Sequence, residues 1–523
     1  MNVLLMQRDH DFQADRPVPW NMDDLVADLG LDWLFAAMAK GDETIDAVCR
    51  HALSTGVADP DTVRYRQAAL RDALANPEAV RALFELATVT VADERKHYFG
   101  LFRDHPDTIL RRSVEVMQMF AERLRGLRAL AEEHVAHFQS GAFDRLFLML
   151  QTELDDAFLA RIDAHLKDLR FRKGLLMSAG LGDGNRGTDY VLREHPEQTG
   201  GFFRRLLGKG QPSYSFTIPE RDEGGFRALD ELRDRGVNLV ANALAQSNDH
   251  ILGFFRALRD ELAFYVGALN LHDALTSRGE PVCFPTPHPL ADGRRRYRGL
   301  YDPSLALQVE HRTVGNDLDA DGKDLIVITG ANHGGKSTFL RALGSAQLMA
   351  GCGLFVAATE ADLSIGSAVV THFKREEDAA LESGKLDEEL KRMASVVENL
   401  TPGAVLLFNE SFASTNEREG SEIARQVVDT LLEGGVHVHF VTHLYDFART
   451  LHAVNAPNHL FLRAPRADDG SRSFHLLEGP PLPTSYGRDL YDEVFRAERP
   501  ATDASNEGDG SKASAETQVG SPT

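Results

Sequence analysis

The stretch LIVITGANHGGKSTFLRALG at residues 325–344 constrains the fold more than any other part of the chain. Its first five residues are aliphatic or β-branched and predict a buried strand, whereas the residues after Ser337 predict a helix. Between them the letters GANHGGKS have the spacing of a phosphate-binding loop. That motif is specific only when a strand precedes it and a helix follows it, and both are predicted here. We therefore expect this segment to bind a nucleotide.

Each residue type in the loop suits a triphosphate. Glycines let backbone N–H groups turn toward phosphates, and the start of the helix adds a partial positive charge. Lys336 is expected to reach the β- and γ-phosphates of ATP, and the Ser337 hydroxyl to ligate Mg²⁺. The expected nucleotide-binding residues are Gly330, Asn332, Gly334, Gly335, Lys336, Ser337 and Thr338.

A second apolar run ends with the letters VLLFNE at residues 405–410. Glu410 is expected to act as the catalytic base or to position the attacking water. Asn409 stands where nucleotide hydrolases usually carry an aspartate, so it offers Mg²⁺ a neutral carbonyl oxygen as a metal contact. A working ATPase, a slow switch and a protein that only binds nucleotide all stay open. We expect slower hydrolysis rather than none, because Lys336, Ser337 and Glu410 remain.

The chain divides into a helical part and a mixed part. From about residue 300, short apolar runs alternate with helical segments, which predicts a mostly parallel sheet with helices on its faces. The fold class expected is α + α/β: a long-helix core and lever domain, then a P-loop NTPase (ABC-type) parallel-sheet domain. The expected segments are an N-terminal helical core (1–105), lever helices (106–275) with an irregular tip (174–222), the ATPase domain (276–497) and a disordered tail (498–523).

Long helices within residues 106–275 are predicted from helical periodicity. A helix start follows Pro106, a break at 139–141 precedes a second helix, and a third helical stretch follows the tip, which contains a short strand-like run at 213–218. A plain helical bundle is the alternative. The three apolar faces comprise Leu110, Met117, Phe120, Leu124 and Leu127, then Leu159, Ile162, Leu166 and Leu169, and finally Ile251, Phe255, Leu258, Leu262 and Tyr265.

Composition limits the compartment and the partners. No apolar run approaches the length of a membrane span, and the N-terminus becomes charged too early for a signal peptide. Three widely separated cysteines form no disulfide framework, which favours the cytoplasm. The net charge of −22 argues against a protein covered in nucleic acid but leaves room for a local basic patch.

These motifs resemble the MutS family of DNA mismatch-repair ATPases. The loop TGANHGGKST is similar to the family's T-G-P-N-M-G-G-K-S-T, and NESFASTNEREG keeps part of its D-E-x-G-R-G-T-x-x-x-D-G. FVTH resembles the family's A-T-H, which makes His443 the counterpart of a catalytic switch histidine near the γ-phosphate. GCGLFVAA at 351–358 and TSYG at 484–487 add to the likeness, as do LGLDWLF and VRYRQAALRD in the helical part.

The resemblance implies an ATP-driven, homodimeric clamp on DNA, with the tip at 174–222 where the clamp would lie. It also implies a short form, because residues 1–20 leave no room for mismatch-recognition and connector domains. The family's S-T-F-x-x-E-M signature, which completes the partner subunit's ATP site, is reduced to SGKLDEEL, in which Glu389 stays in register.

Three further patterns have competing interpretations. His437 and His439 suggest a zinc site but fit ordinary sheet positions better. The basic segments 202–210 and 293–299 suit a phosphate backbone, although such clusters are usually solvated surface. Tyr301 is expected to be a core aromatic, with stacking on adenine as the alternative.

Two functions follow. The first is a cytoplasmic, homodimeric ATPase of the MutS type, using ATP and Mg²⁺ to move helical arms around DNA in repair or recombination. The second is a weakly hydrolysing, nucleotide-gated scaffold that binds a protein or ribonucleoprotein, for which the charge of −22 and Asn409 argue.

Overall fold

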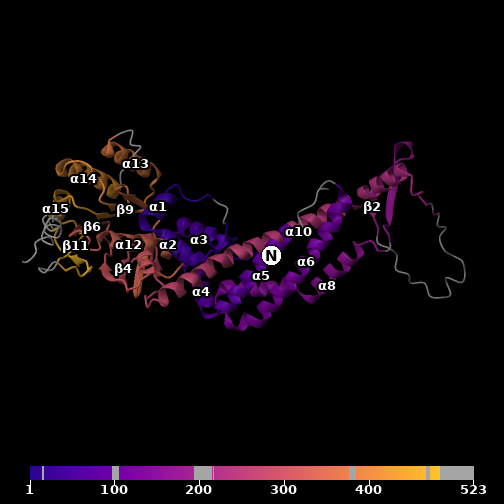
Figure 1. Ribbon diagram of the computed structural model, residues 1–523, viewed down its shortest axis with the longest axis horizontal. Helices are drawn as coiled ribbons and strands as arrows, with labels where there is room; N and C mark the ends of the chain where they lie inside the picture. Colours follow the sequence, from indigo (N-terminus) through magenta and orange to yellow (C-terminus); the bar gives the residue numbers. More distant parts are fainter. Residues whose placement is uncertain are drawn as a thin grey trace, which may run out of the picture.

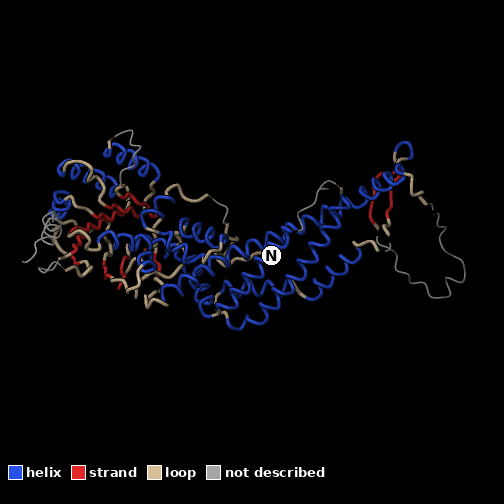
Figure 2. The backbone as a smooth tube through the Cα atoms, viewed as in Figure 1, coloured by secondary structure: helices blue, strands red, loops and turns tan. Residues whose placement is uncertain are grey.

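The protein is described by a computed structural model, in which residues 1–13, 17–96, 105–172, 174–193, 215, 217–375, 384–466 and 471–482 are placed. The molecule is elongated, with two sheets and their helices at one end and long helices extending away from them (Figure 1). Strands occur in two separate places, at the sheet-containing end and in a small hairpin at the opposite end (Figure 2). The expected α + α/β class is therefore found as a helix-rich part joined to sheets with parallel strands.

Short helices with local capping form the N-terminal part. Asp42 and Asp59 each accept hydrogen bonds from backbone N–H groups of the first turn that follows, which satisfies donors that a helix start leaves unpaired. The helices are α1 (Met22–Leu29), α2 (Leu31–Ala39), α3 (Glu43–Thr55), α4 (Pro60–Ala75) and α5 (Pro77–Lys96).

The segment expected to form the lever begins with α6 (Pro106–His134), whose five predicted face residues are all buried. After a short 3₁₀ turn (Val135–His137), the chain forms two helices, α7 (Gly141–Glu153) and α8 (Asp156–Asp168). The prediction of one helix here was wrong. Asp155 accepts a hydrogen bond from the Phe158 N–H and so starts a new helix, a local signal that the apolar periodicity hides.

Helix α10 (Glu223–Thr276) runs for 54 residues and packs along α5 and α6. At its far end lies an antiparallel hairpin of β1 (Met177–Leu181) and β2 (Gly187–Leu192), joined by a 3₁₀ turn (Asp183–Asn185). The strand predicted at 213–218 is not found at 215, 217 or 218, and its other residues lie outside the described part of the chain. The tail, 498–523, also lies outside it.

The larger sheet has six strands in the order β12-β11-β6-β10-β9-β8, all parallel except β12. The smaller sheet has the order β3-β7-β4-β5. The strands are β3 (Thr286–His288), β4 (Arg295–Leu300), β5 (Asn316–Asp319), β6 (Leu325–Gly330), β7 (Glu360–Ser364), β8 (Val369–Phe373), β9 (Val405–Asn409), β10 (His437–Val441), β11 (His459–Ala464) and β12 (Leu477–Glu478).

Helices cover this sheet and connect it to the helical part. The 3₁₀ turn Leu290–Asp292 precedes β4, and the helices are α11 (Pro303–Gln308), α12 (Lys336–Gly351), α13 (Lys385–Asn399), α14 (Glu417–Glu433) and α15 (Tyr445–Val454). One apolar core runs from the N-terminal helices into the sheet, so the two parts share a continuous buried interior. None of the described helices is long and apolar enough to cross a membrane.

The first residues of the chain are fastened to α10 by a buried carboxylate. Glu261 accepts backbone N–H bonds from Leu5 (2.6 Å), Met6 (2.9 Å) and Phe12 (2.7 Å). Burial is the main cause that raises the pKa of Glu261 to about 7, because a charged carboxylate is disfavoured away from water. The N-terminal segment is therefore part of the helical core.

Candidate functional site

The phosphate-type loop connects β6 to α12 at the carboxyl edge of the larger sheet. Gly330 and Gly335 have φ of +117° and +88°, a region that side-chain-bearing residues rarely adopt. A Cβ on Gly330 would also lie 2.5 Å from the carbonyl oxygen of Ala464 on β11. Both glycines are thus required by the backbone path that brings the loop over the end of the sheet.

Lys336 is the first residue of α12, and its side chain curls back over the loop. Its Nζ donates to the carbonyl oxygens of Gly330 (3.0 Å) and Ala331 (2.9 Å). Burial lowers the pKa of this ammonium group to about 8, while the carboxylate of Glu410 acts in the opposite direction. The cation is therefore held at the mouth of the loop, where an anionic ligand would stabilise its charged form.

The next residue contacts the end of the second predicted strand. The Ser337 hydroxyl donates to Oδ1 of Asn409 at 2.9 Å. Strand β10 lies between β6 and β9, so the loop and Asn409 meet across one intervening strand. Hydroxyl and amide oxygens are hard donors of the kind that Mg²⁺ accepts. The pair expected from the sequence is thus adjacent in space, and its oxygen donors fit a magnesium ion.

Glu410 and His443 are also brought together, from the ends of β9 and β10. His443 Nε2 lies 2.8 Å from Oε1 of Glu410 and donates to it. This hydrogen bond is the main reason why the pKa of Glu410 lies below its usual range, with burial opposing it and the charge of Lys336 contributing. The carboxylate is therefore ionised at neutral pH and oriented by an imidazole.

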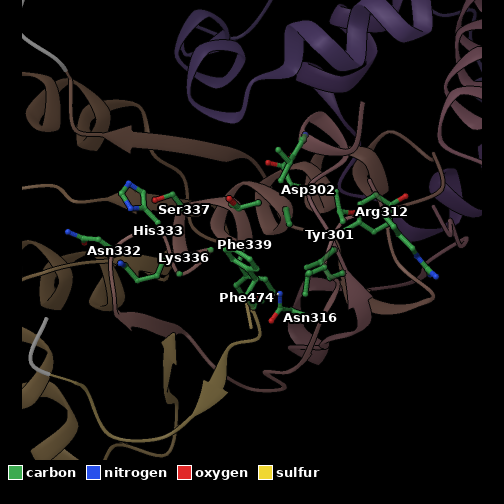
Figure 3. A pocket seen from close by; sticks show the side chains of 18 of the residues that line it. Tyr301, Asp302, Arg312, Asn316, Asn332, His333, Lys336, Ser337, Phe339 and Phe474 are labelled. Carbon is green, nitrogen blue, oxygen red and sulfur yellow. Dashed lines mark hydrogen bonds between the residues drawn. The ribbon is translucent and has the colours of Figure 1, made fainter. Parts of the chain in front are cut away.

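All these groups border one cavity of about 740 Å³. Figure 3 shows Asn332, His333, Lys336 and Ser337 on one side of it and Arg312 on the other, with Phe339 and Phe474 between them. Of the expected residues, Asn332, Gly334, Gly335, Lys336, Ser337, Thr338, Glu410 and His443 line the cavity, while Gly330 and Asn409 border it through Lys336 and Ser337.

Apart from Tyr301, the far side of the cavity was not predicted from the sequence. Phe474 and Phe339 supply apolar walls, and Asn316 holds Phe474 by donating to its backbone carbonyl at 3.1 Å. Tyr301 is 3% exposed and lines the same space, so the core position expected for it is found at the edge of the cavity. No local motif marks these residues, because β5 and the segment after β11 meet only in the folded chain.

The basic segment 293–299 does not form an open cationic surface. Arg294 lies 2.8 Å from Asp321 and Arg298 lies 2.8 Å from Asp317, while Arg295 is buried. The interpretation as ordinary surface is therefore the better one. The second segment, 202–210, lies outside the described residues.

The histidines of β10 occupy sheet positions. His439 is 2% exposed, and His437 Nδ1 lies 3.3 Å from Asp324. Within the described ranges, no group of three or more His, Cys, Asp or Glu residues is placed to hold a metal ion. The interpretation as ordinary sheet residues fits this arrangement.

Residues 58–278 match the family model of the MutS2 N-terminal domain, and residues 326–495 match that of MutS domain V. The chain belongs to the MutS family. The resemblance found in its motifs is thereby confirmed.

The relatives match mainly over a limited region. The DNA mismatch repair protein MutS of Chloroflexus aurantiacus is 29% identical over 195 residues, which is 36% of this chain and 20% of that protein. The DNA mismatch repair protein MutS of Thermus thermophilus is 31% identical over 181 residues (34% and 22%). The MutS protein homolog 4 of Mus musculus is 24% identical over 248 residues (46% and 25%). The matched part of the chain thus spans a fifth to a quarter of each relative.

Proposed function

We propose that this MutS-family chain is a P-loop ATPase that binds ATP with Mg²⁺ and hydrolyses it. The observation that carries the proposal is the convergence of Lys336, Ser337, Asn409, Glu410 and His443 at one edge of a parallel sheet. Ligands of open α/β sheets bind at this edge, outside the carboxyl ends of the strands. An apolar wall with a few convergent polar groups suits a nucleotide, whose base is apolar on its faces.

Each residue has a proposed role. Lys336 places its charge on the phosphates and would exchange its carbonyl partners for phosphate oxygens. Ser337 and Asn409 would hold the magnesium ion, which when bound neutralises phosphate charge. Glu410 orients the attacking water and accepts its proton, and the hydrogen bond from His443 holds the carboxylate in its orientation. Asn409 lacks the negative charge of an aspartate, so turnover is slowed.

Nucleotide binding is tested by calorimetry with ATP and Mg²⁺. Lys336→Ala removes charge-assisted hydrogen bonds worth about 1.5–3 kcal/mol each, so affinity should fall roughly 10- to 100-fold or more. Lys391→Ala, on the exposed surface of α13, is the matched control and should bind as the native chain does. Equal affinity of the native and Lys336→Ala chains would contradict the proposal.

The long helices support a clamp that acts on DNA in repair or recombination. Relatives carry the name DNA mismatch repair protein, and α6 and α10 here extend from the ATP-site end to a distant hairpin. Binding to duplex and branched DNA should weaken as salt rises and should weaken further on deletion of 174–222. A chain that shows no salt-dependent binding to any DNA structure would not be such a clamp. A homodimer and a cytoplasmic setting belong to the same proposal.

A nucleotide-gated scaffold is the second candidate, and Asn409 is the observation that favours it. With a neutral amide beside Ser337, nucleotide would be bound, barely hydrolysed and used to hold one conformation for a protein or ribonucleoprotein partner. Rapid hydrolysis that DNA stimulates would exclude this candidate. Binding of ATP with negligible turnover would favour it.

A further inference from the structure

The turn that carries Glu410 has an unusual backbone. Glu410 and Phe412 have φ of +58° and +63°, in the left-handed region that residues with a Cβ adopt at a cost. Ser411 between them is fully buried. Such a turn keeps its shape only when surrounding contacts determine it. The orientation of the Glu410 carboxylate therefore depends on what holds residues 411 and 412.

Two neighbouring elements hold residues 411 and 412 of the turn. From α13, Glu389 accepts the Phe412 N–H on its Oε1 at 2.6 Å. From β8, the backbone carbonyl of His372 accepts a hydrogen bond from the Ser411 hydroxyl at 2.5 Å. The Nδ1 atom of the His372 ring lies 2.9 Å from the Oγ atom of Ser411. Each residue of the turn beyond Glu410 thus has a partner from a different part of the chain.

The environment of these contacts is closed to water. His372 and Glu389 are 1% and 7% exposed, and the His372 ring stacks on Phe412 with centroids 5.7 Å apart. Burial lowers the pKa of His372 to about 3, so its ring is neutral at physiological pH. Arg392 of α13 donates to the carbonyl of Phe373 at 2.6 Å, which fastens the same helix to the end of β8.

Burial of the Glu389 carboxylate carries a desolvation cost. A buried carboxylate is costly unless hydrogen bonds replace its hydration, and Oε2 of Glu389 has no hydrogen-bond partner among the described residues. The sequence resemblance placed Glu389 in a signature that serves the partner subunit's ATP site. In the structure its carboxylate points into its own subunit, toward the turn after β9.

We propose that Glu389 is a positioning residue for Glu410, acting through the Phe412 N–H and not on the nucleotide. The inference rests on the proposed ATPase function. Helix α13 and the Glu410 turn then move together, because the Phe412 N–H bonds to Glu389 directly, and the His372 ring contacts Phe412 while its Nε2 lies 3.3 Å from the Glu389 carbonyl. Displacement of α13 would misaim the carboxylate without altering the phosphate loop, which belongs to β6 and α12.

The kinetic test compares four variants at Glu389 and its neighbour. Glu389→Ala loses the acceptor, and Glu389→Asp keeps the carboxyl group but is one methylene too short to reach Phe412. Glu389→Gln keeps an acceptor oxygen, and Glu388→Ala is the exposed control on the same helix. Misplacement of a reacting group by about 1 Å costs up to roughly 100-fold, so Ala and Asp should lower kcat about 10- to 100-fold.

The pattern across kcat and KM separates positioning from folding. Glu389→Gln and Glu388→Ala should turn over at the native rate, and KM for ATP should stay within about twofold in all four variants, because the phosphate loop is untouched. Equal kcat for Glu389→Asp and the native chain would overturn the inference, as would a parallel loss of kcat and nucleotide affinity.

A second measurement does not need turnover. The imidazole NMR signals of His443, identified in histidine-labelled protein by their loss in His443→Gln, report the contact with Glu410. They should shift in Glu389→Asp and stay unchanged in Glu388→Ala. If the native chain hydrolyses no ATP, the proposed activity fails, while a shifted His443 signal still supports the positioning contact and an unshifted one refutes it.

Discussion

Two carboxylates show how differently the helical part and the sheet-containing part use the same side chain. Glu261 of α10 is fully buried and accepts three backbone N–H groups from the first residues of the chain. Glu410 after β9 is 34% exposed, borders a cavity and accepts a hydrogen bond from His443. Burial raises the pKa of Glu261 to about 7, whereas the His443 hydrogen bond lowers that of Glu410.

The role of each carboxylate follows from the groups that surround it. Glu261 accepts three backbone N–H groups in a buried setting, and its raised pKa links its protonation to folding. Glu410 is held by a side chain, on a turn with a left-handed backbone, and it faces open space beside Lys336. Glu261 holds the N-terminal segment against α10, and we propose that Glu410 accepts the proton of the attacking water.

Removal of the buried carboxylate should give the largest effect on stability. Glu261→Ala leaves three buried N–H groups without acceptors, each costing about 1–3 kcal/mol, so the free energy of unfolding should fall by about 3–5 kcal/mol. Denaturant unfolding measures the loss, and hydrogen exchange at Leu5, Met6 and Phe12 should locate it. Unchanged exchange at these amides would show that Glu261 does not fasten the segment.

The pH dependence should distinguish the two carboxylates. A folded pKa raised from 4.5 to about 7 means that Glu261 contributes stability below pH 4.5 and loses it as pH rises through 7. Relative to Glu261→Gln, the free energy of unfolding of the native chain should therefore fall by about 3 kcal/mol across that window. Glu410, whose pKa is lowered, should show no such loss in a comparison with Glu410→Gln. If the free energies of unfolding of the native chain and Glu261→Gln differed by the same amount at every pH, the two carboxylates would not differ in this way.

Replacement of His443 tests whether the surroundings of Glu410 serve ATP turnover and not the stability of the fold. In His443→Gln the group that orients Glu410 is changed but the carboxylate stays, so ATP turnover should fall roughly 10-fold while the melting temperature stays near that of the native chain. Parallel loss of turnover and melting temperature would mean that His443 serves the fold instead.

Asn409→Asp should have the smallest effect. The added charge lies beside Ser337 and should strengthen magnesium retention, so turnover should rise by about 10-fold at most and need less Mg²⁺. Titration of activity with Mg²⁺ measures both quantities. A turnover that appears only in this variant would identify the native amide as a brake and favour the scaffold.

Local motifs made the phosphate loop and the polar residues at the end of β9 predictable. The phosphate loop is contiguous in sequence, so the positions of Lys336 and Ser337 follow from spacing alone. Asn409 and Glu410 follow from the apolar run before them, because parallel strands end at one edge. The long apolar faces of the lever helices follow from periodicity in the same way.

The remainder depends on contacts between distant segments. Glu261 binds residues 249 to 256 positions away, and Leu476 donates to Asn316 across 160 positions, so no pattern marks these pairs. The strands β1 and β2 were missed because MSAGL and GTDYVL contain little of the apolar alternation that marks a half-buried strand. Glu389 was assigned through a family signature, and only the packed turn shows where its carboxylate points.

Whether Glu410 serves the reaction and Glu261 the fold is decided by steady-state ATP hydrolysis of the native chain, Glu410→Ala and Glu261→Gln, each confirmed as folded by its melting curve. We expect measurable native turnover, a loss of roughly 100- to 10,000-fold in Glu410→Ala, and near-native turnover in Glu261→Gln. Turnover that survives in Glu410→Ala, or that is lost only in Glu261→Gln, would contradict this division of roles.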